Sequence, residues 1–155
     1  MFSWRDRFAV KDETESDRWF AQGEIFTLGR KLHVYDVNGT EAAFIRQKLL
    51  SLLPRYYIEL NGKVYEFVRE FTLLRPKYTI RNFDWKIDGN FMEHNYTVTD
   101  SHGEVMRITK AWLSWGDFYE LDIANEQNEL LCLCVVLAID CITADASGAA
   151  ASGAH

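Results

Sequence analysis

Seven basic residues recur at equivalent places along this sequence, and their side chains could bind an anion. They lie just after short motifs made of an apolar residue, a hydroxyl residue and then Leu or Trp. Guanidinium and ammonium groups that converge on one point bind phosphate through charge-assisted hydrogen bonds. The alternative interpretation is a set of solvated hairpin turns without a ligand. The seven candidates are Arg5, Arg7, Arg30, Lys31, Arg55, Arg75 and Lys77, and in the same turns only Asp6 and Asp117 oppose them.

No other combination of residues points to catalysis. The sequence contains no nucleophile elbow, phosphate-binding glycine loop, dinucleotide-binding fingerprint or zinc-protease helix. A histidine such as His33 or His94 could act as a general base, but none of the four is paired with a nucleophile. The hydroxyl of the repeated motif recurs in every copy, as a structural position does. We therefore expect a protein that is not an enzyme and needs no cofactor.

The three cysteines, Cys132, Cys134 and Cys141, lie in one apolar run. An odd number of cysteines in such a run predicts buried, reduced thiols in a cytosolic protein. Cys132-x-Cys134 could begin a metal site, but no second ligand pair follows at zinc spacing, so we expect no metal. Residues 1–7 lack the apolar segment of a secretory signal. The apolar run is also shorter than the roughly 20 residues that a membrane-spanning helix needs, so we expect a cytoplasmic protein.

The composition limits the partners of this protein. The chain has 155 residues, of which 17 are Lys or Arg and 23 are Asp or Glu, and its net charge is -6. This length suits one domain, and 48% hydrophobic residues are enough for a core. Binding to nucleic acid without sequence preference needs a broad basic face, so we exclude nucleic acid as a partner. Only a locally basic surface could bind an anionic partner.

The apolar–hydroxyl–Leu/Trp motif is an internal repeat. Its hydroxyl residues recur at a nearly constant interval, except for one interval that is twice as long. A degenerate copy around residues 91–98 would fill that gap. An aromatic or apolar residue follows each motif, and a second apolar residue comes two positions later, as in Tyr56-x-Ile58 and Tyr78-x-Ile80. The hydroxyl residues are Ser3, Thr27, Ser51, Thr72 and Ser114.

Each repeat unit predicts two antiparallel strands. Alternating apolar residues with many aromatic and β-branched side chains are typical of strands. Turn signals fall at Asn38-Gly39, Asn61-Gly62, Asp88-Gly89 and His102-Gly103, and at Gly29, Pro54, Pro76 and Gly116. Six units give about twelve strands in a mostly β, α+β fold. A sheet of this size usually closes into a barrel or splits into two sheets, and we expect a closed barrel.

A hydrophobic C-terminal helix is expected to fill this barrel. Residues 129–144 carry no turn signal and are apolar on every side, as in a helix buried in a core. Sixteen residues of helix span roughly 24 Å, which is long enough to thread a barrel. The β-branched Val135, Val136, Ile139 and Ile142 would also allow a strand. We expect one domain over residues 1–144 and a disordered, small-residue tail over residues 145–155.

Asp140 interrupts the predicted helix. An ionised carboxylate in an apolar segment needs a partner. We expect an Arg or Lys beside Asp140, in a structural role that fixes the helix.

The repeat also separates charges between the two ends of the fold. Equivalent turns lie at the same end, so the seven basic candidates share one end. Trp4 and Trp115 fall in the same turns and could anchor that end at a bilayer interface, although a core position is favoured for both. The opposite turns carry the acidic residues Asp12, Glu13, Glu15, Asp17, Asp36, Glu41, Asp88, Asp100, Glu104, Glu126 and Glu129.

The sequence resembles the LURP-one-related (LOR) family and, more distantly, the tubby C-terminal domain and the phospholipid scramblases. The most specific stretches are residues 48–56 (KLLSLLPRY), 75–80 (RPKYTI), 114–117 (SWGD) and 136–141 (VLAIDC). The resemblance implies a twelve-stranded tubby-like barrel around a central hydrophobic helix. Tubby-like relatives bind phosphoinositide head groups, and scramblases act at membranes.

Two functions from different classes follow from these features. The first is a non-catalytic binding module that recognises an anionic phospholipid or phosphorylated head group at the basic end. Such a protein would be cytoplasmic, peripheral at the membrane and monomeric. The second is a soluble scaffold or regulatory domain of uncharacterised function that presents its rims to a protein partner.

Overall fold

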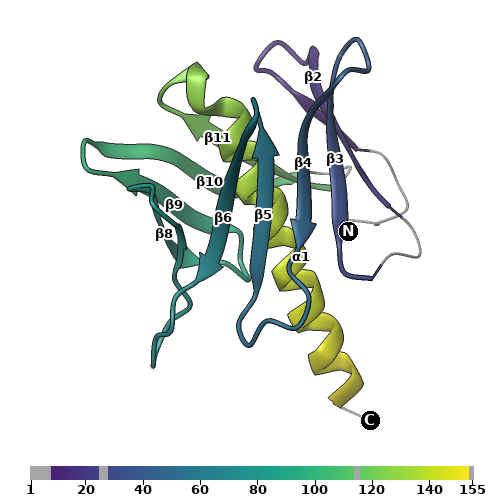
Figure 1. Ribbon diagram of the computed structural model, residues 1–155. Coiled ribbons are helices and arrows are strands. Elements are labelled where there is room, and N and C mark those ends of the chain that lie inside the picture. Colours follow the sequence, from purple (N-terminus) through teal and green to yellow (C-terminus); the bar gives the residue numbers. More distant parts are fainter. Residues whose placement is uncertain (1–7, 25–27, 114–115, 154–155) are drawn as a thin grey trace. The chain divides into compact units, whose positions relative to one another are not determined.

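The computed structural model describes residues 8–24, 28–113 and 116–153. Its strands form one antiparallel sheet in which each strand lies beside the next one along the chain (Figure 1). A short 3-10 helix, η1 (Glu126–Asn128), and the helix α1 (Glu129–Gly153) follow the last strand. The strands are β1 (Phe8–Lys11), β2 (Asp17–Gly23), β3 (Lys31–Asp36), β4 (Glu41–Gln47), β5 (Arg55–Leu60), β6 (Lys63–Arg69), β7 (Tyr78–Ile80), β8 (Lys86–Asn90), β9 (Asn95–Asp100), β10 (Gly103–Leu113) and β11 (Gly116–Ile123).

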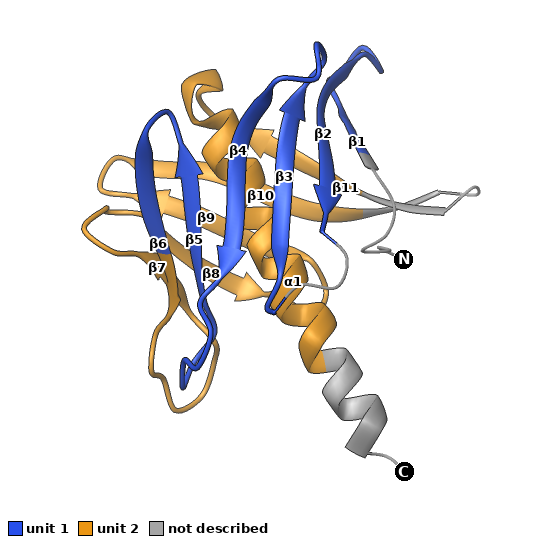
Figure 2. Ribbon diagram, turned by 45° about the vertical axis from the view of Figure 1, so that its right-hand side comes forward, with its two compact units in different colours: residues 1–66 blue, residues 67–155 orange. Residues whose placement is uncertain are grey.

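The mostly β architecture and the C-terminal helix are confirmed, whereas a closed barrel is not. The described residues form eleven strands, and no pairing among them joins β1 to β11. These eleven strands compare with an expectation of about twelve, and the last repeat unit contributes only β11 before the chain enters η1 and α1. The chain divides into two compact units, Met1–Glu66 (unit 1) and Phe67–His155 (unit 2) (Figure 2). The expected division between a domain of residues 1–144 and a disordered tail stays a prediction.

Unit 1 follows the alternation that its sequence predicts. Buried and partly exposed residues alternate along β5 and along the central parts of β3 and β4. Successive side chains of a strand point to opposite faces, so this period of two gives the sheet one apolar face. The side chains of that face are Ala21, Leu32, Val34, Ala43, Ile45, Tyr56, Ile58 and Leu60.

Unit 2 combines an aromatic cluster with the apolar helix. Phe67, Tyr78, Phe91 and Tyr96 form a chain of ring contacts, with centroids 4.8–5.1 Å apart. Every residue of α1 from Leu131 to Thr143 is buried. The segment is therefore a core helix and not a strand. It begins at Glu129 as expected, and it continues past Ala144 to Gly153.

One predicted turn was wrong, and the reason is a close approach between two strands. Asp88-Gly89 lies inside β8, and the chain turns instead at residues 91–94. Gly89 pairs with Tyr96 and has a φ of 145°. A Cβ atom at Gly89 would lie 2.6 Å from the Asn95 carbonyl oxygen and 2.6 Å from Tyr96 Cα. Gly89 is required here because any side chain would collide with the backbone of β9.

We expect Gly89→Ala to lower the free energy of unfolding by roughly 3 kcal/mol, because the strain of its φ adds to a backbone clash. Gly62→Ala is the matched control: its φ is 71°, but a Cβ there meets no atom within 4 Å. The control should lose only about 1 kcal/mol. Urea denaturation of the two variants measures the difference, and equal losses would contradict the clash.

Candidate functional site

Three candidate basic residues lie at one edge of unit 1. β3 begins there, β4 ends there and β5 begins there, at the foot of the sheet in Figure 1. The Gln47 amide donates to the Arg30 carbonyl oxygen at 2.8 Å, and the Lys48 amide donates to the Arg55 carbonyl oxygen at 2.9 Å. These backbone hydrogen bonds place Arg30, Lys31, Lys48 and Arg55 side by side, and we call this group the basic edge.

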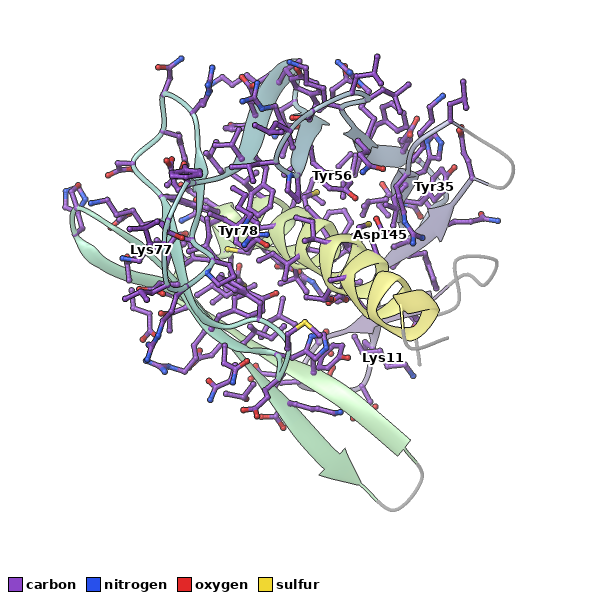
Figure 3. The ribbon with its side chains drawn as sticks, turned by 90° about the horizontal axis from the view of Figure 1, so that it is seen from below. Lys11, Tyr35, Tyr56, Lys77, Tyr78 and Asp145 are labelled. Carbon is purple, nitrogen blue, oxygen red and sulfur yellow. The ribbon has the colours of Figure 1, made fainter. Side chains whose placement is uncertain are left out.

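The structure brings only some of the seven candidates together. Arg75 and Lys77 lie in unit 2, in the loop before β7. Lys77 is exposed and lies farther from α1 than the neighbouring Tyr78, which is buried (Figure 3). Arg5 and Arg7 lie outside the described residues, as do Trp4 and Trp115. Lys48 was not among the candidates because it precedes its motif, although its place directly after a strand that ends at this edge could have identified it.

Two carboxylates that the sequence analysis did not place near the basic residues lie beside them. Lys31 Nζ lies 4.0 Å from a Glu24 oxygen, and Arg55 Nη1 lies 3.0 Å from Glu66 Oε1. Lys31 and Arg55 of the basic edge therefore each have a carboxylate beside them. Glu24 directly follows β2 and Glu66 lies in β6, and the sequence does not reveal how these strands pair with β3 and β5.

Lys77 of unit 2 also has an acidic neighbour. Its Nζ lies 3.9 Å from an Asp88 oxygen. The sequence had assigned Asp88 to the acidic end. That assignment was wrong because Asp88 lies within β8 and not in a turn. The residue before it, Ile87, pairs with Tyr78, which directly follows Lys77.

The hydroxyl of the repeated motif has a structural role where it is described. Ser51 Oγ donates to the Leu53 carbonyl oxygen at 2.7 Å, and Thr72 Oγ1 donates to the Arg75 carbonyl oxygen. Each bond holds the loop that follows the motif, which confirms the interpretation for these two copies. Ser3, Thr27 and Ser114 lie outside the described residues.

Several acidic residues of the opposite turns serve the backbone. Oδ1 of Asp12 accepts from the amides of Thr14 and Ser16 at 2.8 and 3.0 Å, and Oδ1 of Asp36 accepts from two turn amides in the same way. Such bonds from Asp side chains are a standard means of fixing turns. The Thr14 hydroxyl and these amides hold the pKa of Asp12 below its usual value. Asp12 and Asp36 thus bring negative charge to these turns of unit 1 because their side chains hold the turn backbone in place.

The partner of Asp140 is a histidine. Within the described part of the chain, His94 Nδ1 lies 3.4 Å from Asp140 Oδ1, and both side chains are largely buried. The expected Arg or Lys was wrong, since the basic group comes from the turn between β8 and β9. His94 has a φ of 53°, in the left-handed region, and its ring stacks on Tyr119 with centroids 4.4 Å apart. The contact joins α1 to two parts of unit 2.

The environment of Asp140 disfavours its charged form. Burial raises the pKa of the Asp140 carboxyl, and the nearby His94 offsets part of that rise. The 3.4 Å separation is long for a charge-assisted hydrogen bond, which explains why the offset is incomplete. The Tyr96 hydroxyl is also buried, and its pKa is raised well above the usual value by burial and then by Asp140.

His33 lies on the partly exposed face of unit 1. Its Nε2 lies 2.9 Å from Glu24 Oε1, its Nδ1 contacts Glu41 Oε1, and its ring stacks on Phe44. Burial lowers the pKa of His33, but the two carboxylates outweigh burial and raise it overall. Contacts with carboxylates at both ring nitrogens favour the protonated form of His33, since both nitrogens of that form are donors.

The cysteines are free and buried, as expected. Burial, with a smaller effect of Glu129, raises the pKa of Cys132 to about 12, and burial likewise raises the pKa of Cys134. Thiols that stay protonated react slowly. In the described residues we find no group of three or more side chains suited to hold a metal ion. No described helix is long and apolar enough to cross a membrane.

Comparisons of the sequence with known proteins identify a family and one relative. The profile of the family described as LURP-one-related matches residues 1–140. The chain is also 38% identical over 143 residues to "Uncharacterized protein YxjI" of Bacillus subtilis (strain 168), a match that covers 92% of this chain and 88% of that protein. The chain therefore belongs to the LURP-one-related family. No solved structure matches it.

Replacing Asp140 should change how stability depends on pH. A raised carboxyl pKa in the folded state means that the stability contributed by Asp140 is complete below its unfolded pKa and is lost as pH rises through the folded value. Asp140→Asn does not titrate. We therefore expect the free energy of unfolding of Asp140→Asn to rise relative to wild type as pH increases above about 4, by at most about 1.4 kcal/mol per pH unit.

Urea denaturation of both proteins across this range measures the trend. Asp122 is exposed on β11, so Asp122→Asn removes the same charge from solvent and serves as the control. A free energy of unfolding of Asp140→Asn that stays constant or falls relative to wild type as pH rises would contradict the assignment.

Proposed function

We propose that this protein is a non-catalytic module that binds anionic phospholipid surfaces through the basic edge of unit 1. The observation that carries the proposal is the grouping of Arg30, Lys31, Lys48 and Arg55 by the register of β3, β4 and β5. Phosphate-bearing head groups are the anions that such a row of cations suits best. The distant relatives to which the sequence was likened, tubby-like proteins and scramblases, point in the same direction.

The charges set the kind of binding to expect. A Lys or Arg near an anionic membrane contributes about 1 kcal/mol, and the effect falls off within a Debye length. Glu24 lies beside Lys31 and Glu66 beside Arg55, so attraction through the edge alone is weak and sensitive to salt. The net charge of -6 repels the rest of the protein from the same surface. Binding should therefore be reversible and should depend on how the protein is oriented.

The loop of unit 2 that carries Arg75 and Lys77 is a second candidate surface of the same chemistry. Arg75 is exposed, whereas Lys77 has Asp88 within 3.9 Å. Arg75→Glu tests this loop separately from the basic edge.

Reversing one charge at the basic edge tests the proposal. We expect Lys48→Glu to weaken binding to vesicles of phosphatidylcholine and phosphatidylserine on the order of tenfold, because two units of charge change at the surface. Lys63→Glu makes the same change at the other edge of unit 1, beside the Asn61-Gly62 turn, and should have little effect. Co-sedimentation at low salt measures both variants.

The outcome also separates this function from a scaffold that binds a protein partner. Equal binding by Lys48→Glu and Lys63→Glu would show that the basic edge is not the surface that binds the vesicles. Failure of the wild type to bind anionic vesicles would reject the lipid function and leave the scaffold.

A further inference from the structure

Large apolar side chains are exposed beside the basic edge. Leu50 and Leu52 are fully exposed, and Leu28 is 83% exposed. Leu50 and Leu52 lie in the loop of residues 48–54, which joins β4 to β5. Lys48 and Arg55 flank this loop on its two sides. Contiguous exposed apolar side chains on a folded protein commonly mark a surface that binds a partner or a membrane.

The loop is held in a defined conformation that turns these leucines outward. Leu50 has a φ of 54°, in the left-handed region, and the Ser51 hydroxyl is bonded inward to the Leu53 carbonyl oxygen. Leu49 lies against the neighbouring loop, because a Cβ at Gly29 would be only 2.8 Å from Leu49 Cδ2. The repeated motif thus directs its hydroxyl to the backbone and its two apolar side chains to solvent.

Unit 2 repeats the arrangement at the equivalent motif. Phe71, Leu73 and Leu74 are 83%, 92% and 95% exposed, and the Thr72 hydroxyl bonds the Arg75 carbonyl oxygen. Arg75 and Lys77 follow directly. If the two apolar residues on either side of the hydroxyl were buried, the repeat would be explained as a core motif. They are exposed in both described copies, so a role in the core does not explain the repeat.

We propose that Leu50 and Leu52 insert into the acyl boundary of an anionic bilayer while Lys48 and Arg55 contact the head-group phosphates. This inference rests on the proposed function and names the side chains that would anchor it. Charge complementarity favours a bilayer over a protein as the partner, because cations lie on both sides of the apolar tip. Short apolar side chains on a loop between cations match the layering of a bilayer, where phosphates lie above the hydrocarbon.

Removing the leucines should weaken vesicle binding even where charge is unchanged. Leu50→Ser/Leu52→Ser is expected to lower affinity for phosphatidylcholine–phosphatidylserine vesicles on the order of a hundredfold, since two leucine side chains would lose their burial. Val37→Ser/Val64→Ser is the matched control, because Val37 and Val64 are also more than half exposed but lie at the other edge of unit 1. The control should bind like wild type.

Insertion can be tested directly with a dye on an introduced cysteine, because the native cysteines are buried and should not be labelled. Since Cys132, Cys134 and Cys141 are buried, a thiol-reactive, polarity-sensitive dye should label Leu52→Cys selectively in the folded protein. Anionic vesicles should shift its emission to the blue, and spin-labelled lipids should quench it. Dye on Val64→Cys should show neither change.

The outcomes distinguish the insertion from the underlying function. If wild type binds and Lys48→Glu weakens it, but the leucine variant binds normally and the dye does not respond, the insertion is wrong and head-group binding stands. If the wild-type protein does not bind anionic vesicles, both the lipid-binding function and the leucine insertion are wrong. Binding that is lost in the leucine variant, together with a blue shift confined to Leu52→Cys, supports both.

Discussion

The burial of one apolar helix is the constraint on which the rest of this structure depends. Residues 131–143 of α1 have no exposed side, so the segment cannot lie on a surface. Asp140, the one carboxylate within that stretch, lies 3.4 Å from His94 of unit 2, and burial raises the pKa of its carboxyl. Within unit 1, β3, β4 and β5 present one apolar face made of alternate buried residues.

That division of faces leaves the turns to carry the other properties of the protein. At one set of turns, Asp side chains bind backbone amides and so bring negative charge with them. At the other set, hydroxyls bind backbone carbonyls and apolar side chains point outward among Lys and Arg. Within each unit, the turns fixed by Asp side chains therefore carry negative charge, while the loops that follow the repeated motif carry exposed apolar side chains close to Lys and Arg.

The sequence predicted what local periodicity determines. The strands around Tyr56-x-Ile58 and Tyr78-x-Ile80 and the start of the helix at Glu129 follow from alternation and from an unbroken apolar run. It missed what pairing between distant residues determines. Gly89 looked like a turn glycine but serves a close approach to β9, and His94 reaches Asp140 from another element. The pairing of Arg55 with Glu66 and the exposure of Leu50 likewise depend on register and loop geometry.

The central claim is that an acidic protein binds an anionic membrane through one local edge. The most direct measurement is a binding titration of the wild-type protein with phosphatidylcholine vesicles and with vesicles that contain phosphatidylserine, each at low and high salt. The account predicts saturable binding to the anionic vesicles that weakens as salt increases, and much weaker binding to phosphatidylcholine alone. Equal binding to both vesicle types, or no binding to either at low salt, would contradict it.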